Sequence, residues 1–225
     1  MTEFDPIFRD ASAHGVIVGV ALPSPNAEIS PMAWRKLRRE EIQHAQGLRG
    51  HRLTSWVGGR IAAHSAINIL GLDSGPILTG ELGEPTPAEG VSLSISHKPT
   101  MAVALAARSE LGSVGIDLEC LSPERAGIQE RVLSENELEE IQKLEKERSW
   151  ISLLQRFSTK ESIYKALAPQ HRRMIGFDEA EVFPNTDGSS LIRLYLHRPP
   201  YPQNIEARYI WLEDHLITTV RAQWT

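Results

Sequence analysis

A short alternating stretch near the middle of the chain places the strongest constraint on its fold. Residues 91–97 (VSLSISH) alternate strictly between apolar side chains and serine over their first six positions. This period of two is typical of a strand with one buried face. Residues 101–107 (MAVALAA) and 114–119 (VGIDLE) have a similar character, and a break at 108–112 separates them. The centre of the chain therefore predicts three consecutive strands.

The segments on either side of this centre follow one another in a repeated order. The elements predicted before it are a strand at 13–22, helices at 31–49 and 52–70, and a loop rich in Pro and Gly at 75–90. Those predicted after it are an acidic helix from Ser134, a helix at 150–168, and strands at 177–183, 191–197, 205–212 and 216–223. No residue-level repeat is evident. The order nevertheless predicts an α/β (α+β) protein with two pseudo-symmetric halves, residues 1–110 and 111–225, and a ligand cleft between them.

Four residues mark predicted helix ends. Ser30 is a good N-cap before Pro31, and Ser134 stands three residues before Glu137, which is the spacing of a capping box. Gly71 follows an apolar-periodic segment and should end its helix. Pro169 should end the long helix of the second half.

Composition excludes several classes of protein. The chain has 225 residues and a formal net charge of −5, which argues against a general nucleic-acid binder. No apolar run approaches the ~18–20 residues needed to cross a membrane, and the N-terminus does not resemble a secretory signal. The single cysteine, Cys120, cannot form an internal disulfide, and one cysteine excludes cysteine-ligated zinc. We therefore expect a cytoplasmic protein. Because a chain of two halves can form the whole site alone, we also expect a monomer.

Positive charge is concentrated in the first quarter of the chain. It comprises the run 35–39 (RKLRR) together with Arg49, Arg52 and Arg60. Such a run is most often a solvated helix face. The alternative is that this quarter meets an anionic ligand or partner. Gly58 and Gly59, which precede Arg60, are costly in a helix and indicate a close approach by backbone or ligand.

Two carboxylates share one face of the strand at 114–119. Because side chains two apart on a strand point the same way, Asp117 and Glu119 lie beside each other above Gly115. Paired carboxylates repel unless a cation lies between them, and Mg²⁺ binds through few carboxylates together with waters and phosphate oxygens. Gly115 would leave room for a ligand. A solvent-facing acidic edge is the equal alternative.

Two further segments carry charged or polar groups suited to a phosphate. In the run 157–165 (FSTKESIYK), Glu161 and Lys165 lie four apart on one helix face. They form either a surface ion pair or a site in which Glu161 is a third metal ligand or base and Lys160 and Lys165 hold phosphate. At the end of the strand at 91–97, the sequence Ser-His-Lys supplies three phosphate donors, although its histidine could equally be a core residue.

These segments, in this order, resemble the 4′-phosphopantetheinyl transferase family, of the type that activates surfactin- and enterobactin-like synthetases. The resemblance runs from about Arg49 to Leu167. It rests on Gly59-Arg60, Ser94-Ile95-Ser96-His97, Gly115-Ile116-Asp117-Leu118-Glu119, and Phe157-Ser158-Thr159-Lys160-Glu161-Ser162 with Lys165. The family fold, two pseudo-symmetric halves with coenzyme A between them, agrees with the repeated order of elements.

The resemblance implies a catalytic metal site. Asp117 and Glu119 match strand carboxylates that bind Mg²⁺, with Mn²⁺ as the alternative ion. Glu161 matches the helix carboxylate that completes the metal site and helps to deprotonate the acceptor serine. Lys165 matches a lysine near the coenzyme A pyrophosphate, with a role as proton donor to the leaving group. Glu137 falls where an acidic residue often stands beside the site.

The resemblance also implies contacts to coenzyme A. Ser96 and His97 match phosphate contacts, and Arg60 matches the arginine at the 3′-phosphate. Arg52 and Lys160 belong to the same expected set of coenzyme A-binding cations.

The implied reaction moves the phosphopantetheine arm of coenzyme A onto a serine of an apo peptidyl or acyl carrier protein, giving holo carrier protein and 3′,5′-ADP. Siderophore, polyketide and fatty acid synthesis remain open as pathways, as does tolerance for acyl-coenzyme A. The basic first quarter is the expected carrier-docking surface. Two alternatives remain, a non-catalytic protein that binds coenzyme A or a carrier protein, and another metal-dependent phosphotransferase.

Overall fold

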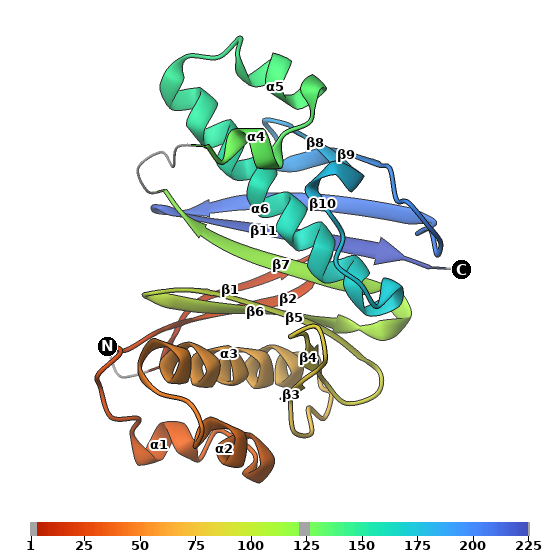
Figure 1. Cartoon of the computed structure of the whole chain (residues 1–225). Coiled ribbons are helices and arrows are strands. Elements are labelled where there is room, and N and C mark those ends of the chain that lie inside the picture. The colour runs from red at the N-terminus through yellow and green to blue at the C-terminus, as the bar shows by residue number, and fades with distance from the viewer. Residues whose placement is uncertain (1–3, 122–126, 225) are drawn as a thin grey trace.

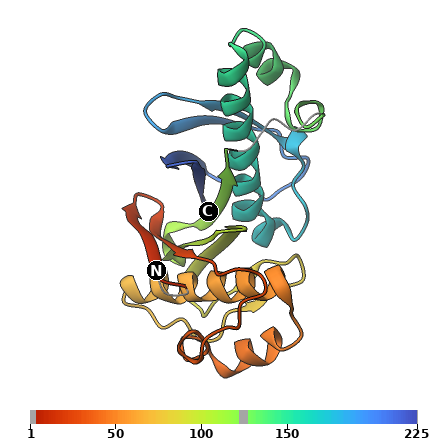
Figure 2. The same cartoon turned by 90° about the vertical axis from the view of Figure 1, so that its left-hand side faces the viewer.

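Two antiparallel sheets face each other across the middle of the molecule, and a long helix packs on the far side of each (Figure 1). The computed structural model describes residues 4–121 and 127–224. The first sheet has strand order β1-β2-β6-β5, and the second has order β7-β11-β10-β9-β8. Helix α3 covers the first sheet and α6 the second, so the expected α+β architecture is confirmed. Figure 2 shows the two lobes one above the other.

The elements of the first lobe lie before residue 112. They are β1 (Pro6–Ser12), β2 (Gly15–Ala21), α1 (Pro31–Trp34), α2 (Arg39–Ala45), α3 (Gly50–Ile69), β3 (Leu78–Thr79), β4 (Pro85–Thr86), β5 (Val91–Lys98), β6 (Met101–Arg108) and the 3₁₀ turn η1 (Ser109–Leu111).

The elements of the second lobe follow Gly112. They are β7 (Ser113–Cys120), α4 (Gln129–Val132), α5 (Glu135–Ile141), α6 (Lys146–His171), the 3₁₀ turn η2 (Phe177–Glu179), β8 (Ala180–Pro184), β9 (Ser189–Leu194), β10 (Asn204–Leu212) and β11 (His215–Gln223). No helix within 4–121 or 127–224 is long and apolar enough to span a membrane.

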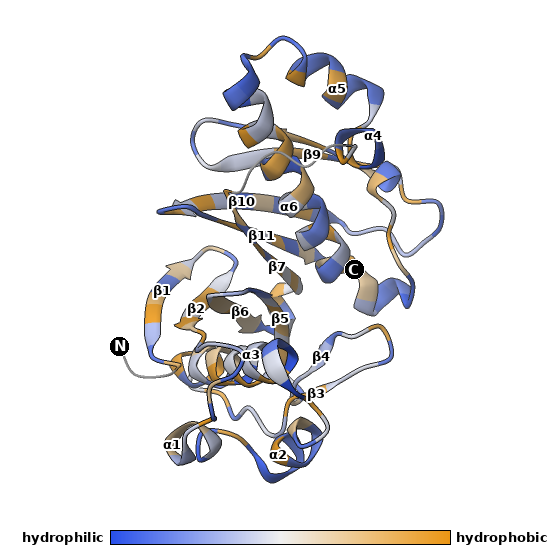
Figure 3. Cartoon of the chain, turned by 60° about the vertical axis from the view of Figure 1, so that its left-hand side comes forward, coloured by the Kyte–Doolittle hydropathy of each residue, from blue (hydrophilic) through white to orange (hydrophobic). Residues whose placement is uncertain are grey.

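Strand β6 shows how strand periodicity builds the layered core. Ala102, Ala104 and Ala106 face α3, whereas Met101 and Val103 face β7 and β11 in a separate cluster between the sheets. Every β6 residue except Arg108 is buried, because this strand is covered on both faces. Hydrophobic residues accordingly concentrate on the strands, and α5 at the edge of the second lobe is mostly hydrophilic (Figure 3).

The serines of β5 join the two sheets. Ser92 and Ser94 each accept a hydrogen bond at 3.0 Å through Oγ, from the backbone N–H groups of Val114 and Ile116 respectively. The polar face of β5 thus binds the backbone of β7 through side chains. The alternation predicted for 91–97 is confirmed, and its serine face lies against the second lobe.

The predicted helix ends are mostly confirmed. The Ser30 side chain caps α1 ahead of Pro31, and Ser134 forms the predicted capping box with Glu137. Helix α3 ends just before Gly71, which has a φ of +70°.

Several predicted boundaries are wrong. The helix expected at 31–49 is two short helices, α1 and α2, and the loop at 75–90 contains the small hairpin β3–β4. Helix α6 runs past Pro169 to His171. Strand β1 was not predicted, because its sequence (PIFRDAS) has no run of alternating apolar residues, and none of its side chains is buried.

The structure shows a residue-level correspondence between the lobes that the sequence analysis missed. In the first lobe, Glu41 accepts from His64 Nε2 at 2.9 Å, and in the second, Glu137 accepts from Lys160 Nζ at 2.7 Å. In both pairs the donor lies 23 residues after the glutamate. Each carboxylate also accepts the backbone N–H three residues before it. The residues that donate to the two glutamates, His64 and Lys160, are of different types, so the repeat is not visible in the sequence.

Strands β2 and β7 extend the correspondence. The segments VGVAL at 18–22 and VGIDL at 114–118 both form the strand that precedes the helices of their lobe. At the matching positions the first lobe has Ala21 and the second has Asp117. Only the second lobe carries the acidic chemistry.

Candidate functional site

Asp117 lies at the centre of the candidate site, buried on β7 between the lobes. Its Oδ1 accepts from Ser96 Oγ at 2.9 Å and from Lys165 Nζ at 2.7 Å. Its Oδ2 accepts from Ser158 Oγ at 2.9 Å. Residues of β5, β7 and α6 therefore converge on one carboxylate. The sequence analysis expected Ser96 and Lys165 near a phosphate, and in the structure they bind Asp117.

Gly115 allows α6 to lie against β7. A Cβ atom at this position would lie 1.9 Å from the Ser162 carbonyl oxygen. The space beside Gly115 is therefore filled by helix backbone, and the expectation that it leaves room for a ligand is wrong. The close approach places Glu161 and Lys165 beside the carboxylates of β7.

Glu161 is half-buried and close to the two strand carboxylates. Burial raises the pKa of the Glu161 carboxyl, the Asp117 and Glu119 charges raise it further, and Lys165 and Lys98 oppose them. Glu161 also lines a hollow of ≈ 370 Å³ together with Phe157, Phe177 and Arg131. A raised pKa suits a group that accepts a proton, and a bound divalent cation would reverse the shift.

Ammonium groups already occupy the carboxylates. Lys165 pairs with Asp117 and Lys98 pairs with Glu119, both at 2.7 Å. Within the described residues no three His, Cys, Asp or Glu side chains are arranged to hold a metal ion. The donor set of Asp117, Glu119 and Glu161 nevertheless fits Mg²⁺ chemically, because Mg²⁺ is a hard cation and carboxylate oxygens are its usual protein ligands. A metal bound there would lie beside the two ammonium groups, and their repulsion would oppose it.

A second cleft, of ≈ 450 Å³, opens beside this cluster and is lined by basic and aromatic side chains. The lining residues include His44, His51, Arg52, Trp56, Arg60 and His97. His97 is exposed there, so its alternative role as a core residue is wrong. Partial desolvation by the walls of the cleft and nearby positive groups lower the pKa of His97, which favours its neutral form. The arginines of this cleft suit a negatively charged ligand, and its aromatic side chains suit a ligand that also carries an aromatic ring.

Arg60 helps to shape this cleft from α3. It is 7% exposed. Its Nε and Nη2 donate to the carbonyl oxygens of Ile77 and Leu78 at 3.1 and 2.9 Å, and its guanidinium stacks on Trp56 at 4.3 Å. Part of its hydrogen-bonding capacity therefore holds the β3–β4 hairpin. Arg52, which is exposed, lines the same cleft.

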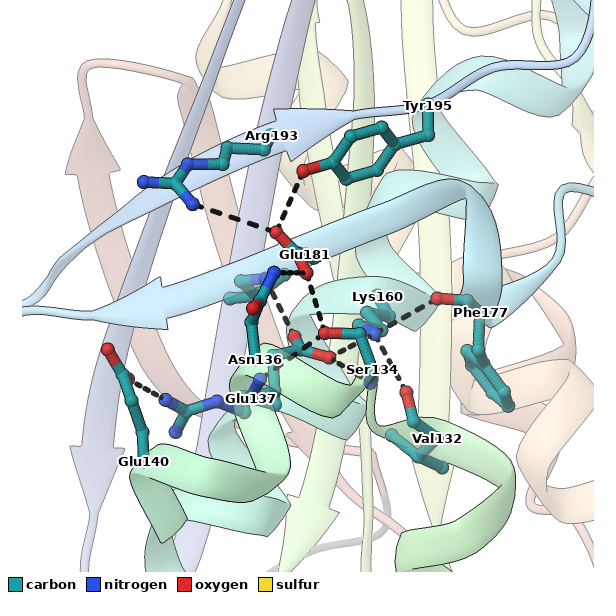
Figure 4. A network of polar contacts seen from close by, with 12 residues as sticks. Val132, Ser134, Asn136, Glu137, Glu140, Lys160, Phe177, Glu181, Arg193 and Tyr195 are labelled. Carbon is teal, nitrogen blue, oxygen red and sulfur yellow. Dashed lines mark hydrogen bonds and ion pairs between the residues drawn. The ribbon is translucent and has the colours of Figure 1, made fainter.

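Lys160 and Glu137 lie outside the clefts, in a buried network of the second lobe (Figure 4). Lys160 Nζ donates to Glu137 Oε2 and to the Val132 oxygen at 2.7 Å, and to the Phe177 oxygen at 3.0 Å. These contacts use all three ammonium hydrogens of a side chain that is 3% exposed. Lys160 is therefore not placed to hold phosphate, and Glu137 binds Lys160 instead of standing at the metal group.

Three residues of the site were not assigned roles by the sequence analysis. Ser158 binds Asp117, and Thr218 on β11 joins Ser158 at 2.9 Å. His51 forms an edge contact with His97 at 5.7 Å between ring centroids. Ser158 lies within the recognised motif, but nothing in the sequence near Thr218 indicated its proximity to α6.

Comparisons with known proteins match both lobes. The model of the 4′-phosphopantetheinyl transferase superfamily matches residues 113–220, and that of the 4′-phosphopantetheinyl transferase N-terminal domain matches residues 39–107. The chain belongs to this superfamily. The family resemblance predicted from the motifs is therefore confirmed.

Individual relatives agree with this family membership. The 4′-phosphopantetheinyl transferase Svp of Streptomyces mobaraensis is 34% identical over 71% of this chain and 66% of its own length. PptT of Mycobacterium tuberculosis is 27% identical over 77% of this chain and 74% of its own length. The matched part of this chain thus spans about two thirds to three quarters of these relatives.

Among solved structures, a holo-(acyl-carrier-protein) synthase from Bacillus anthracis in complex with CoA (3′,5′-ADP) aligns with a TM-score of 0.41 and 20% identity. The alignment covers 51% of this chain and 97% of that chain.

Proposed function

We propose that this member of the superfamily transfers the 4′-phosphopantetheine arm of coenzyme A to a serine of an apo carrier protein. The products are holo carrier protein and 3′,5′-ADP. The observation that carries the proposal is the convergence of Asp117, Glu161 and Lys165 beside a basic cleft. Together they supply acid–base groups, metal ligands and cations within reach of one pyrophosphate.

The proposed ligand positions follow the two clefts. Coenzyme A lies between the lobes, with its phosphates at Ser96, His97 and Lys165 and its 3′-phosphate toward Arg52 and Arg60. Mg²⁺, held by Asp117, Glu119 and Glu161, would supply charge neutralisation at the pyrophosphate. The division of the chain into halves near residue 110 is part of this proposal, because the proposed contacts to coenzyme A come from both halves.

Two side chains of α6 have proposed roles in proton transfer. Glu161 takes the proton of the acceptor serine as its hydroxyl oxygen attacks the β-phosphorus of coenzyme A. Lys165 donates to the phosphate oxygen that leaves with 3′,5′-ADP. Their positions one helical turn apart allow both to face the same substrate.

The direct test is intact-protein mass spectrometry of apo peptidyl and apo acyl carrier proteins incubated with coenzyme A, Mg²⁺ and this protein. Each carrier that serves as substrate gains the mass of one phosphopantetheine arm. Asp117→Asn and Glu161→Gln should reduce the rate about 100-fold or more. Glu139→Gln, which changes an exposed glutamate of α5, is the matched control and should keep full activity.

The same assay separates the alternatives. Tight coenzyme A binding without transfer to any carrier would support the non-catalytic binding protein. Full activity in both site variants would contradict the proposed roles of Asp117 and Glu161. Comparing the rates on the two carriers indicates which biosynthetic pathway this protein serves.

The basic surface of residues 35–39 is the proposed carrier-docking site. Arg35, Lys36, Arg38 and Arg39 are exposed, and Arg38 also contacts Ser74. Charge reversal at Arg35 and Arg39 should therefore raise the KM for an acidic carrier at low salt. An unchanged KM would contradict this surface while leaving the transferase activity intact.

A further inference from the structure

Lys98 connects the two lobes at the carboxylate group. It is the last residue of β5, and its Nζ donates to Glu119 Oε1 of β7 at 2.7 Å. The Lys98 side chain is 23% exposed and that of Glu119 is 5% exposed. The ammonium is therefore partly exposed, whereas the carboxylate that it binds is almost fully covered.

We propose that Lys98 competes with the divalent cation for Glu119, so that metal binds weakly to the free protein and tightly once coenzyme A is present. This inference rests on the proposed metal site. A carboxylate can bind a cation and accept from an ammonium at the same time, but the two positive charges then lie side by side and repel each other. The Lys98 ammonium therefore opposes metal binding at Glu119, and moving this ammonium away relieves the repulsion.

The charges around the site explain why coenzyme A would matter. Asp117, Glu119 and Glu161 face two ammonium groups, Lys98 and Lys165, so the free site is already largely neutralised. A divalent ion added to it meets repulsion from both lysines. A bound pyrophosphate adds negative charge and offers oxygen acceptors to a released Lys98. Metal and coenzyme A should therefore bind cooperatively, each raising the affinity of the other by the same factor.

The test is a titration of the free protein with Mn²⁺. Electron paramagnetic resonance measures the concentration of unbound Mn²⁺ at each step. Removing one positive charge next to the ligand in Lys98→Met should tighten Mn²⁺ binding roughly tenfold or more. Lys98→Arg keeps the charge and should bind Mn²⁺ about as weakly as the original protein. Lys143→Met, which removes an exposed charge after α5, should leave the affinity unchanged.

A double variant tests whether Lys98 acts through Glu119. In the Glu119→Gln background, adding Lys98→Met should tighten Mn²⁺ binding by a smaller factor than in the original protein. Repeating the titrations with saturating coenzyme A should show a large gain in Mn²⁺ affinity for the original protein and a smaller gain for Lys98→Met.

Equal Mn²⁺ affinities of the original protein and Lys98→Met would overturn the competition while leaving the metal site in place. Tightening by an equal factor in the Glu119→Gln background would also overturn it. Absence of Mn²⁺ binding in every variant, with and without coenzyme A, would overturn the metal site together with the inference. Phosphopantetheine transfer is measured separately, so failure of the proposed activity is distinguishable from each of these results.

Discussion

At the residue scale, Gly115 has the sharpest steric requirement near the site. A side chain there would collide with the backbone of α6 at Ser162, so the helix must move away from β7. Gly115→Ala should therefore lower the free energy of unfolding by about 3 kcal/mol or more. Chemical denaturation measures this loss. Gly47→Ala is the control, because its new Cβ would come no closer than 3.6 Å to the His44 oxygen, and it should be nearly neutral.

His14 predicts a pH dependence of stability. It is 1% exposed and binds Thr219 Oγ1 at 3.0 Å, and burial with nearby Arg221 lowers the pKa of His14 from 6.5 to about 4. The unfolded chain therefore binds a proton more readily. The stabilisation is complete above pH 6.5 and is lost as the pH falls toward 4.

The expected size of this effect is about 2 kcal/mol between pH 7 and pH 5. Urea unfolding at both pH values measures it. His14→Gln should reduce the difference between the two free energies by about that amount. An unchanged pH dependence in His14→Gln would contradict the role of His14 and assign the effect to other groups.

At the element scale, one buried ion pair holds α4 and α5 against α6. Glu137 accepts from Lys160, and its other oxygen accepts from the backbone N–H of Val182 on β8 at 2.8 Å. Glu181 adds contacts from β8 to Ser134 and Asn136, each at 2.7 Å (Figure 4). This network positions the end of α4, which lines the hollow beside Glu161.

Breaking this pair should therefore be costly. Glu137→Leu leaves the Lys160 ammonium buried without its carboxylate and should cost about 3–5 kcal/mol of unfolding free energy. Adding Lys160→Met should restore part of the loss, but not all, because the Val182 N–H still lacks an acceptor. Thermal and urea denaturation of the two single variants and the double variant test this. Simple addition of the two losses would contradict a direct coupling.

At the scale of the whole molecule, the contact between β5 and β7 determines whether the site forms. Ser94 is 2% exposed and accepts the Ile116 N–H. Ser94→Ala leaves this buried donor unpaired and should cost about 1–2 kcal/mol. Denaturant unfolding measures the cost, and hydrogen exchange at the Ile116 amide should become faster. Slow exchange at Ile116 equal to that of the original protein would contradict the role of the serine.

Much of the architecture was predictable because periodicity is a local property. The strict alternation at 91–97, the Ser30 and Ser134 caps and the glycine after α3 each depend on neighbours only a few residues away. The extent of α6 past Pro169 was not predictable in this way, because its last residue, His171, contacts the ring of Trp224 near the other end of this lobe's sequence, at 6.1 Å between ring centroids.

The candidate site shows the same difference between features set by neighbours in the sequence and features set by tertiary packing. Spacing predicted that Glu161 and Lys165 share one face of α6, and the family resemblance predicted that they lie near Asp117. In the structure Lys165 Nζ lies 2.7 Å from Asp117 Oδ1. The motifs misplaced Lys160, which lies next to Glu161 in the sequence but on another face of α6, toward Glu137. One helical position rotates a side chain by about 100°, so adjacency in the sequence does not mean adjacency in the site.

The sequence by itself determined the family and most of the order of the elements, because both depend on residue type and short-range spacing. Only the tertiary structure decided what each charged group binds. Lys98 meets Glu119, Lys160 meets Glu137 and Ser158 meets Asp117. These pairs join elements far apart in the chain, and their partners are selected by the packing of two sheets and two helices, which no local pattern encodes.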